Sequence, residues 1–286
     1  MTDGSVVLTE GPVENTAVIT ISRTAKDNLM TSAMAGQFTA HLDAVDRDDD
    51  TKVVIIRGDG KHLCAGWDPA DAWTHYLAAP GGSVRKHPSQ RARLLAQDQS
   101  WWGPEGLYGR LLRCRKVTII EARGMCLDTG LYLVLCGDLV ISSDDAYFGS
   151  PRWHNVGVDG DMALLFATVG LKRAKELMYC NVAWSARRAL DFGLVDYVVD
   201  DPVTAAGELA ATCSSIIRDG IVTEKYAVFA SLEKMGIGHS FAATTVVAAS
   251  LSNIHFQPGE YNFLHDLRDA GPFAALARSR AGLRIL

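Results

Sequence analysis

The chain has 286 residues, 48% of them apolar, and a formal net charge of −5 at pH 7. This size and apolar content can bury a large core, so one domain with a small appendage is expected rather than two equal domains. The negative charge and the lack of a basic stripe interleaved with aromatic residues argue against a nucleic-acid partner.

The six cysteines form no CxxC pair and show no metal-ligand spacing, so we expect reduced core thiols and no metal site. No apolar run reaches the roughly 18 residues that a membrane span needs, and the N-terminus lacks a basic-then-apolar signal segment. We therefore expect a soluble, cytoplasmic protein with no membrane partner.

In chain order, the first expected elements are two short β-rich runs, Ser5 to Leu8 and Ala17 to Ile21, which begin as a hairpin. Thr31 or Ser32 then caps a helix that runs to Val45, because the apolar residues between them are spaced for one buried face.

A buried strand is expected next, over Val53 to Ile56, followed by a glycine-rich turn and the loop Lys61 to Asp68. The order of strand, glycine turn and loop recurs from Val117 to Gly130. Two such units side by side would bring their loops to one pocket.

The stretch from Glu121 to Asp161 is expected to organise the rest of the chain. It reads as a strand, a sharp turn at Gly124, a loop, and an apolar helix from Leu131 to Cys136. Because this helix is apolar on several faces, it should be buried all round. Its N-terminus then directs unpaired N–H groups and a partial positive charge into the space that the loop encloses. A developing oxyanion would be stabilised there.

Beyond Asp201 the composition shifts to alanine-rich helices, expected over residues 205–217, 222–235 and 241–251. We therefore expect a core over residues 1–200 and a helical C-terminal region over residues 201–286.

Several motifs, spread over about residues 5–200, resemble those of the crotonase (enoyl-CoA hydratase/isomerase) superfamily. They are Asn28-Leu29-Met30, Cys64-Ala65-Gly66-Trp67-Asp68, Gly124 to Asp138, Phe148-Gly149-Ser150-Pro151, and the helix and return strand within Leu164 to Val199.

This resemblance implies an α/β fold, a crotonase-like spiral of ββα units with a helical C-terminal region that mediates trimerisation. It also implies a homotrimer, or a hexamer built as a dimer of trimers. The substrate would be an acyl-CoA, with coenzyme A as part of the substrate and no cofactor bound permanently.

The family holds the thioester carbonyl oxygen with two backbone N–H groups, which by position belong to Trp67 and Thr129. Thr129 stands where the family has its middle glycine, yet a peptide N–H serves whatever side chain it carries. The alternative is that the oxyanion hole has degenerated. For Asp128, beside it, we expect a capping role at the following helix, which would take up the carboxylate charge.

Hydration of a double bond requires two carboxylates. The family's first glutamate position is Tyr132 here, and the second falls on Arg152 or on Trp153, depending on the residue from which it is counted. Neither Tyr nor Arg serves as a base at pH 7. Ordinary enoyl-CoA hydratase activity is therefore expected to be absent or weak.

The segment from Trp153 to Asp161 resembles the 4-chlorobenzoyl-CoA dehalogenase branch, in which a nucleophilic Asp stands at the position of Asp161. Dienoyl-CoA isomerases use an Asp at the same place as an acid/base. His154 would orient Asp161 or fill a core site, and Glu105 stands where the dehalogenases have a histidine base. The plain alternative is that Asp161 caps the helix that starts near Met162.

Two groups of residues are expected to contact the substrate. The group expected along coenzyme A comprises Arg23, Lys26, Lys61, His62, Leu63 and Ala65. The group expected around the acyl end comprises Trp73, Trp101, Trp102, Asp128, Arg152 and Trp153. The many tryptophans predict a bulky or cyclic acyl group.

The resulting hypothesis is an enzyme that polarises a carbonyl, with Asp161 as nucleophile or base. Hydrolytic or substitutive attack on an acyl-CoA or β-diketone-like substrate is preferred. One alternative is an isomerase or hydratase-like lyase of fatty or cyclic acid degradation. Another is a catalytically inactive homologue that binds coenzyme A.

Overall fold

The computed structural model describes residues 4–72, 89–97, 101, 103, 105–157, 162–237, 246 and 256–286. Apart from residue 246, the helix predicted over residues 241–251 lies outside this range.

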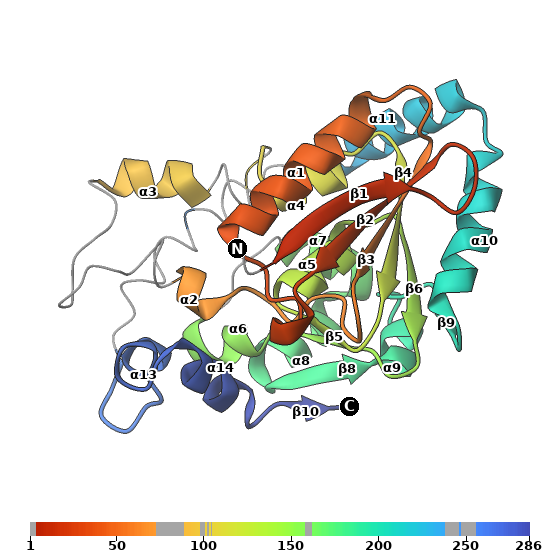
Figure 1. Cartoon of the computed structure of the whole chain (residues 1–286). Helices are drawn as coiled ribbons and strands as arrows, with labels where there is room; N and C mark the ends of the chain where they lie inside the picture. The colour runs from red at the N-terminus through yellow and green to blue at the C-terminus, as the bar shows by residue number, and fades with distance from the viewer. Residues whose placement is uncertain are drawn as a thin grey trace.

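The fold is built on two sheets (Figure 1). The six-stranded sheet has the order β1-β2-β3-β4-β6-β9, in which only β1 is antiparallel to its neighbour. Its strands are β1 (Ser5–Glu10), β2 (Thr16–Ser22), β3 (Val53–Gly58), β4 (Val117–Ala122), β6 (Leu139–Ser143) and β9 (Tyr197–Val199). The four-stranded sheet has the order β10-β8-β7-β5. Its strands are β5 (Met125–Leu127), β7 (Tyr147–Gly149), β8 (Val182–Ser185) and β10 (Arg284–Ile285).

From β4 to β7, successive strands alternate between the sheets, and each pair leads into a helix. Strand β4 belongs to the larger sheet, β5 to the smaller one, and α5 (Thr129–Cys136) follows. Strands β6 and β7 repeat this order before α6 (Pro151–Val156). This repeat confirms the predicted spiral of ββα units.

The first long helix, α1 (Ser32–Arg47), forms as predicted. The Thr31 hydroxyl accepts a hydrogen bond from the Met34 N–H at 3.2 Å, and the predicted apolar face is buried. The other helices described before residue 200 are η1 (Thr24–Lys26), α2 (Pro69–Ala72), α3 (Gln90–Gln97), α4 (Leu107–Leu112), α7 (Met162–Val169), α8 (Leu171–Tyr179) and α9 (Ala186–Asp191).

Helix α5 is buried over all eight of its residues, as its apolar sequence predicts. It begins at Thr129, two residues before the predicted start. Gly124 supplies the predicted turn with φ +50°, and a Cβ there would lie 2.3 Å from the His62 ring. The turn therefore requires glycine for both conformation and space.

The C-terminal helices cover the core from two sides. Helix α10 (Pro202–Ser214) places Ala206 and Ala210 against the larger sheet, so the first helix after residue 200 packs into the core. Helix α11 (Arg218–Lys234) is anchored by the Lys225 ammonium, 2.6 Å from Asp138 Oδ1. Helices α13 (Phe263–Asp269) and α14 (Pro272–Arg280) lie near α2 and α6 (Figure 1).

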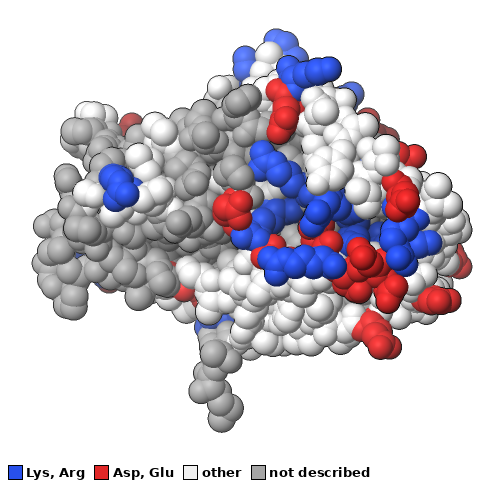
Figure 2. All heavy atoms as spheres, turned by 90° about the horizontal axis from the view of Figure 1, so that it is seen from above, with Lys and Arg blue, Asp and Glu red and all other residues white. Residues whose placement is uncertain are grey.

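Charged side chains of both signs are interleaved on the face seen in Figure 2. The charged contacts of the protein include Arg115 Nε to Asp46 Oδ2 at 2.9 Å and Lys52 to the Ser214 carbonyl at 2.9 Å. Such contacts tie the C-terminal helices and the loop before β4 to the core. Within the described ranges, no helix is both long and apolar enough to span a bilayer.

Candidate active site

Residues Cys64 to Trp67 form a short extended segment beside β5. The Cys64 N–H donates to the Met125 carbonyl, and the Cys64 carbonyl accepts from the Leu127 N–H, each at 3.1 Å. The two loops that the sequence predicted to meet are therefore joined by backbone hydrogen bonds.

On its other edge, this segment is bonded to Met30. The Gly66 carbonyl accepts from the Met30 N–H at 2.8 Å, and the Asp68 N–H donates to the Met30 carbonyl at 2.9 Å. Because both groups face Met30, the N–H of Trp67 between them faces the opposite way, toward the side of β5 and α5.

The start of α5 is packed directly onto the same segment. A Cβ at Gly130 would lie only 2.3 Å from the Cys64 carbonyl oxygen, so glycine is required there. Thr129 is the first residue of α5, and its N–H cannot join a hydrogen bond within the helix. The N–H groups of Trp67 and Thr129 thus border one space, an arrangement that supports the predicted oxyanion hole.

Asp128 does not cap α5, so the capping prediction is wrong. Its side chain makes no hydrogen bond to the helix N–H groups. The backbone adopts φ 48° and ψ −107°, which turns the carboxylate toward Ser150 instead. The Ser150 hydroxyl donates to Asp128 Oδ1 at 2.6 Å, and Oδ2 lies 2.8 Å from where a Cβ of Gly66 would be.

Tyr132, at the family's first glutamate position, is hydrogen-bonded to Trp153, one of the two candidates for the second, and neither is a carboxylate. The Trp153 indole N–H donates to the Tyr132 hydroxyl at 3.0 Å, and both side chains are buried. Burial raises the pKa of Tyr132 well above its usual value of about 10. Arg152, the other candidate for the second position, is half-buried, and its charge opposes this rise.

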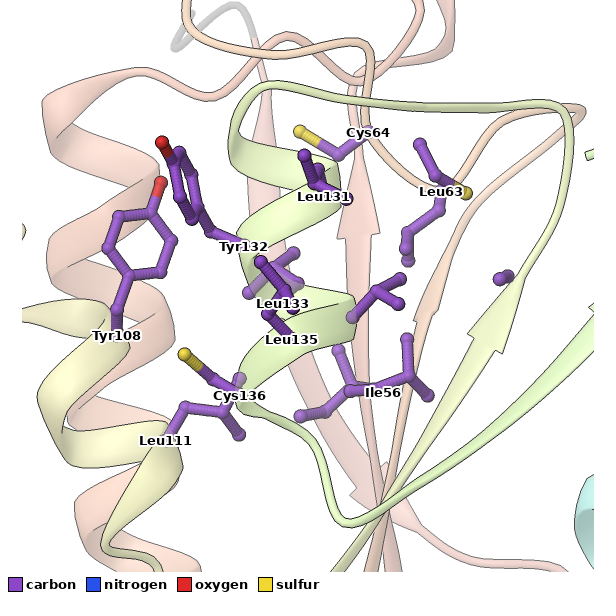
Figure 3. Packing of buried hydrophobic residues seen from close by; sticks show 14 of the residues in the cluster. Ile56, Leu63, Cys64, Tyr108, Leu111, Leu131, Tyr132, Leu133, Leu135 and Cys136 are labelled. Atoms are coloured by element: carbon purple, nitrogen blue, oxygen red, sulfur yellow. The ribbon is translucent and has the colours of Figure 1, made fainter. Parts of the chain in front are cut away.

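Five aromatic rings form a continuous row beside the start of α5. The centroid distances are 5.0 Å for Trp67 to Trp101, 5.9 Å for Trp101 to Tyr108, 5.2 Å for Tyr108 to Tyr132 and 6.1 Å for Tyr132 to Trp153. Figure 3 shows Tyr108 and Tyr132 side by side, their hydroxyl groups pointing the same way. The row includes the predicted pocket residues Trp101 and Trp153, with Tyr108 and Tyr132 between them.

Tyr108 was not predicted, although it hydrogen-bonds to the Thr129 side chain. It lies in α4, a short apolar stretch with no motif, so the sequence offered no signal beyond its proximity to the two tryptophans at 101 and 102. Burial raises its pKa well above the usual range.

The other predicted catalytic residues that the structure describes are not placed beside the N–H groups of Trp67 and Thr129. Glu105 is 72% exposed at its side chain and pairs with Arg110 at 2.7 Å. His154 is exposed on α6. Asp161 and the predicted pocket residues Trp73 and Trp102 lie outside the described residues.

Of the residues predicted to contact coenzyme A, three are buried. Arg23 pairs with Asp68 at 2.5 Å, and Asp68 Oδ1 in turn accepts from two N–H groups at the start of α2. Arg23 therefore holds the loop around Trp67. Leu63 and Ala65 are fully buried, and their N–H groups donate to the carbonyls of Arg123 and Asp27.

The other three line the adjoining surface. Lys61 is exposed, and the Lys26 ammonium lies 3.8 Å from the centroid of the Phe273 ring on α14. His62 Nδ1 accepts from the Met125 N–H at 3.0 Å, so this nitrogen is unprotonated, and burial lowers the pKa of His62. The structure shows a further contact that was not predicted. The Arg280 guanidinium of α14 donates a hydrogen bond to the Ala65 carbonyl.

Across the described part of the chain, no cluster of three or more His, Cys, Asp or Glu side chains could hold a metal ion.

The model of the enoyl-CoA hydratase/isomerase family matches residues 12–268. The chain belongs to this family, the crotonase superfamily. It is 29% identical over 215 residues to a probable enoyl-CoA hydratase, EchA14, of Mycobacterium tuberculosis, covering 74% of this chain and 77% of the relative.

Similarity extends to proteins with another activity in their names. The chain is 26% identical over 197 residues to a peroxisomal Delta(3,5)-Delta(2,4)-dienoyl-CoA isomerase of Arabidopsis thaliana, covering 66% and 69% of the two chains. The crystal structure of an enoyl-CoA hydratase/isomerase from Xanthobacter autotrophicus Py2 superimposes with a TM-score of 0.76 at 26% identity, covering 98% of each chain. These matches do not show a relation to the dehalogenase branch, which stays a prediction.

Proposed function

We propose that this crotonase acts on an acyl-CoA by holding the thioester carbonyl oxygen between the N–H groups of Trp67 and Thr129. Attack on the carbonyl is then hydrolytic or substitutive rather than hydration of a double bond. In such a site, two preorganised N–H groups stabilise the negative charge that develops on the oxygen.

The observation that carries this proposal is the hydrogen bond between Tyr132, at the first glutamate position, and Trp153, which with Arg152 is a candidate for the second. Hydration needs one group to deprotonate water and another to protonate carbon. A buried phenol with a raised pKa stays neutral at physiological pH, and an indole neither accepts nor releases a proton there. Carbonyl polarisation needs neither glutamate.

The substrate is expected to carry a ring or another bulky apolar group at its acyl end. Five aromatic rings border the start of α5, and such a row favours flat apolar groups through stacked and edge contacts. Coenzyme A belongs to the substrate and would approach along Lys26, Lys61 and His62.

Asp161 remains the candidate nucleophile or base that the sequence motif suggests. A nucleophilic Asp161 would displace the thiolate of coenzyme A from the thioester carbonyl and form a mixed anhydride. Water that opens this anhydride at the Asp161 carbonyl would leave one labelled oxygen in the protein in a single turnover. A basic Asp161 would activate water that attacks directly, and the label would go to product.

Double-bond isomerisation is the second candidate function. The similarity to a dienoyl-CoA isomerase favours it, and one base can move a proton between two carbons on the same face.

The test is a panel of acetyl-, crotonyl- and phenylacetyl-CoA, with thiol release and product mass followed in parallel. We expect thiol release, fastest with the ring-bearing substrate. Isomerised product without thiol release would favour the second function. Affinity without any product would contradict both and indicate a protein that only binds coenzyme A esters.

A further inference from the structure

Asp128 carries a carboxylate that is about nine-tenths buried and takes no part in capping α5. Its Oδ1 accepts a hydrogen bond from the Ser150 hydroxyl at 2.6 Å. Its Oδ2 lies against Gly66, at 2.8 Å from the position a Cβ would take there. The fold thus aims this carboxylate at the segment Cys64 to Trp67.

This placement puts Asp128 at the edge of the proposed oxyanion hole. The peptide that joins Asp128 to Thr129 supplies one of the two N–H groups, and the peptide that joins Gly66 to Trp67 supplies the other. A carbonyl oxygen held by both would therefore lie next to the Asp128 carboxylate.

The other ionisable side chains described around the start of α5 are poor proton acceptors. Burial raises the pKa of the Cys64 thiol to about 12, and it raises the pKa values of Tyr108 and Tyr132 well above their usual range. Each of these groups keeps its proton at neutral pH. Arg152 is permanently charged and accepts none.

The backbone at Asp128 is held in a conformation that disfavours any side chain. With φ 48° and ψ −107°, it lies in a region that glycine adopts far more easily than residues with a Cβ. Strained residues persist where the surrounding structure imposes them, and they concentrate at functional sites. Folding alone would favour glycine at this position.

We propose that Asp128 is a catalytic base of this site, an inference that rests on the proposed acyl-CoA hydrolysis. Its carboxylate takes a proton from a water molecule as the oxygen of that water bonds to the carbonyl carbon. The π electron pair of the carbonyl moves to the oxygen held by Trp67 and Thr129. When that pair returns, the C–S bond breaks, and the departing thiolate takes the proton from Asp128. The products are a carboxylic acid and free coenzyme A, and Asp128 is again a carboxylate.

Proton uptake also removes an electrostatic conflict. An ionised carboxylate beside a developing oxyanion is repelled by it. Because Asp128 becomes neutral in the step that creates the negative charge on the carbonyl oxygen, the two charges never coexist. Ser150 holds the carboxylate in place for this step.

The experiment compares the wild type with Asp128→Asn, Asp128→Gly and a matched control, Asp201→Asn. Asp201 is a true cap, since its Oδ1 accepts from the N–H groups of Val203 and Thr204 at 3.1 Å each. Asn caps a helix about as well as Asp, so the control should keep full activity and stability. Phenylacetyl-CoA is the probe, with thiol release, calorimetric affinity and Tm as readouts.

We expect Asp128→Asn to lower the rate of thiol release by roughly 10²-fold or more while the Kd stays within about threefold. Asp128→Gly should be equally slow while its Tm stays within about 4 °C of wild type, because the relief of backbone strain offsets the loss of the acceptor for the Ser150 hydroxyl. A loss of activity with stability kept cannot come from misfolding.

Two outcomes would overturn the inference. Asp128→Asn could release thiol at more than half the wild-type rate. Asp128→Gly could lose stability and affinity together, which would make Asp128 a structural residue. A wild type that binds phenylacetyl-CoA without releasing thiol, or that binds no acyl-CoA, would instead refute the proposed function itself.

Discussion

The indole N–H of Trp153 donates a 3.0 Å hydrogen bond to the hydroxyl of Tyr132, from α6 to α5. Both side chains are buried, and the contact extends into an aromatic row that reaches Trp67. The pair has a structural role, since it joins two helices that border the proposed oxyanion hole. It leaves proton transfer to other groups.

Tyr132→Phe should lower stability without removing activity. The substitution takes away the acceptor of the buried Trp153 N–H, which costs about 1–3 kcal/mol. Urea unfolding measures this loss, and turnover should stay within about threefold of wild type because a neutral phenol is not the base. In a double-mutant cycle with Trp153→Phe, the coupling energy should be about 1 kcal/mol. A hundredfold loss of turnover at unchanged stability would instead make Tyr132 catalytic.

Gly66→Ala should damage both fold and activity. Gly66 has φ +119°, and an added Cβ would meet Asp128 Oδ2 at 2.8 Å. We expect a loss of about 1–3 kcal/mol from the strained backbone and a fall in turnover of roughly tenfold or more, because the Trp67 N–H shifts. Gly36→Ala is the matched control, since its Cβ meets no atom within 4 Å in α1. That change should stabilise the protein by about 0.5–1 kcal/mol. Equal effects of the two substitutions would contradict the prediction.

Stability should fall as the pH drops below about 6.5, in part through His62. Burial lowers the pKa of His62 from its usual 6.5, so the unfolded chain takes up a proton at a higher pH than the folded chain does. The contribution of His62 is therefore fully present above pH 6.5 and is lost as the pH falls through the window down to the folded pKa. In His62→Gln the unfolding free energy should depend less on pH between 8 and 5.5. If the unfolding free energies of the wild type and of His62→Gln depended on pH in the same way, His62 would be excluded as a source of the pH dependence.

The chain should self-associate as a trimer or as a pair of trimers. The C-terminal half exposes large apolar side chains, among them Ile217 at 73%, Met235 at 61% and Val228 at 50%. Exposed apolar patches of this kind mark surfaces that associate with other proteins. Sedimentation velocity at micromolar concentration should give a trimer or hexamer, and Ile217→Lys should weaken it. A stable monomer would contradict this and would exclude any residue donated by a neighbour.

Sequence patterns predicted the fold well because its elements depend on local signals. The Thr31 cap, the alternation of the first strands, the Gly124 turn and the wholly apolar α5 each follow from short-range rules. The meeting of the loops around Trp67 and Thr129 followed from the repeated order of strand, turn and loop.

The side-chain contacts could not be predicted in the same way. Asp128 stands at an N-cap position, and the capping rule failed because the backbone there has φ 48° and ψ −107°, which turns the carboxylate toward Ser150 and away from the helix N–H groups. The contact of Arg280 with the Ala65 carbonyl joins residues 215 positions apart and has no local signal. Tyr108 joins the aromatic row only through packing.

The most direct test of the central claim is the rate of crotonyl-CoA hydration, followed by the loss of the enoyl absorbance, beside the rate of thiol release from phenylacetyl-CoA. Because the two glutamate positions hold Tyr132 with Trp153 or Arg152, hydration should run roughly 10²-fold or more below an ordinary hydratase, the scale lost with a general base. Thiol release should be readily measured in the same preparation. Hydration at the rate of an ordinary hydratase, with the thioester left intact, would contradict the account.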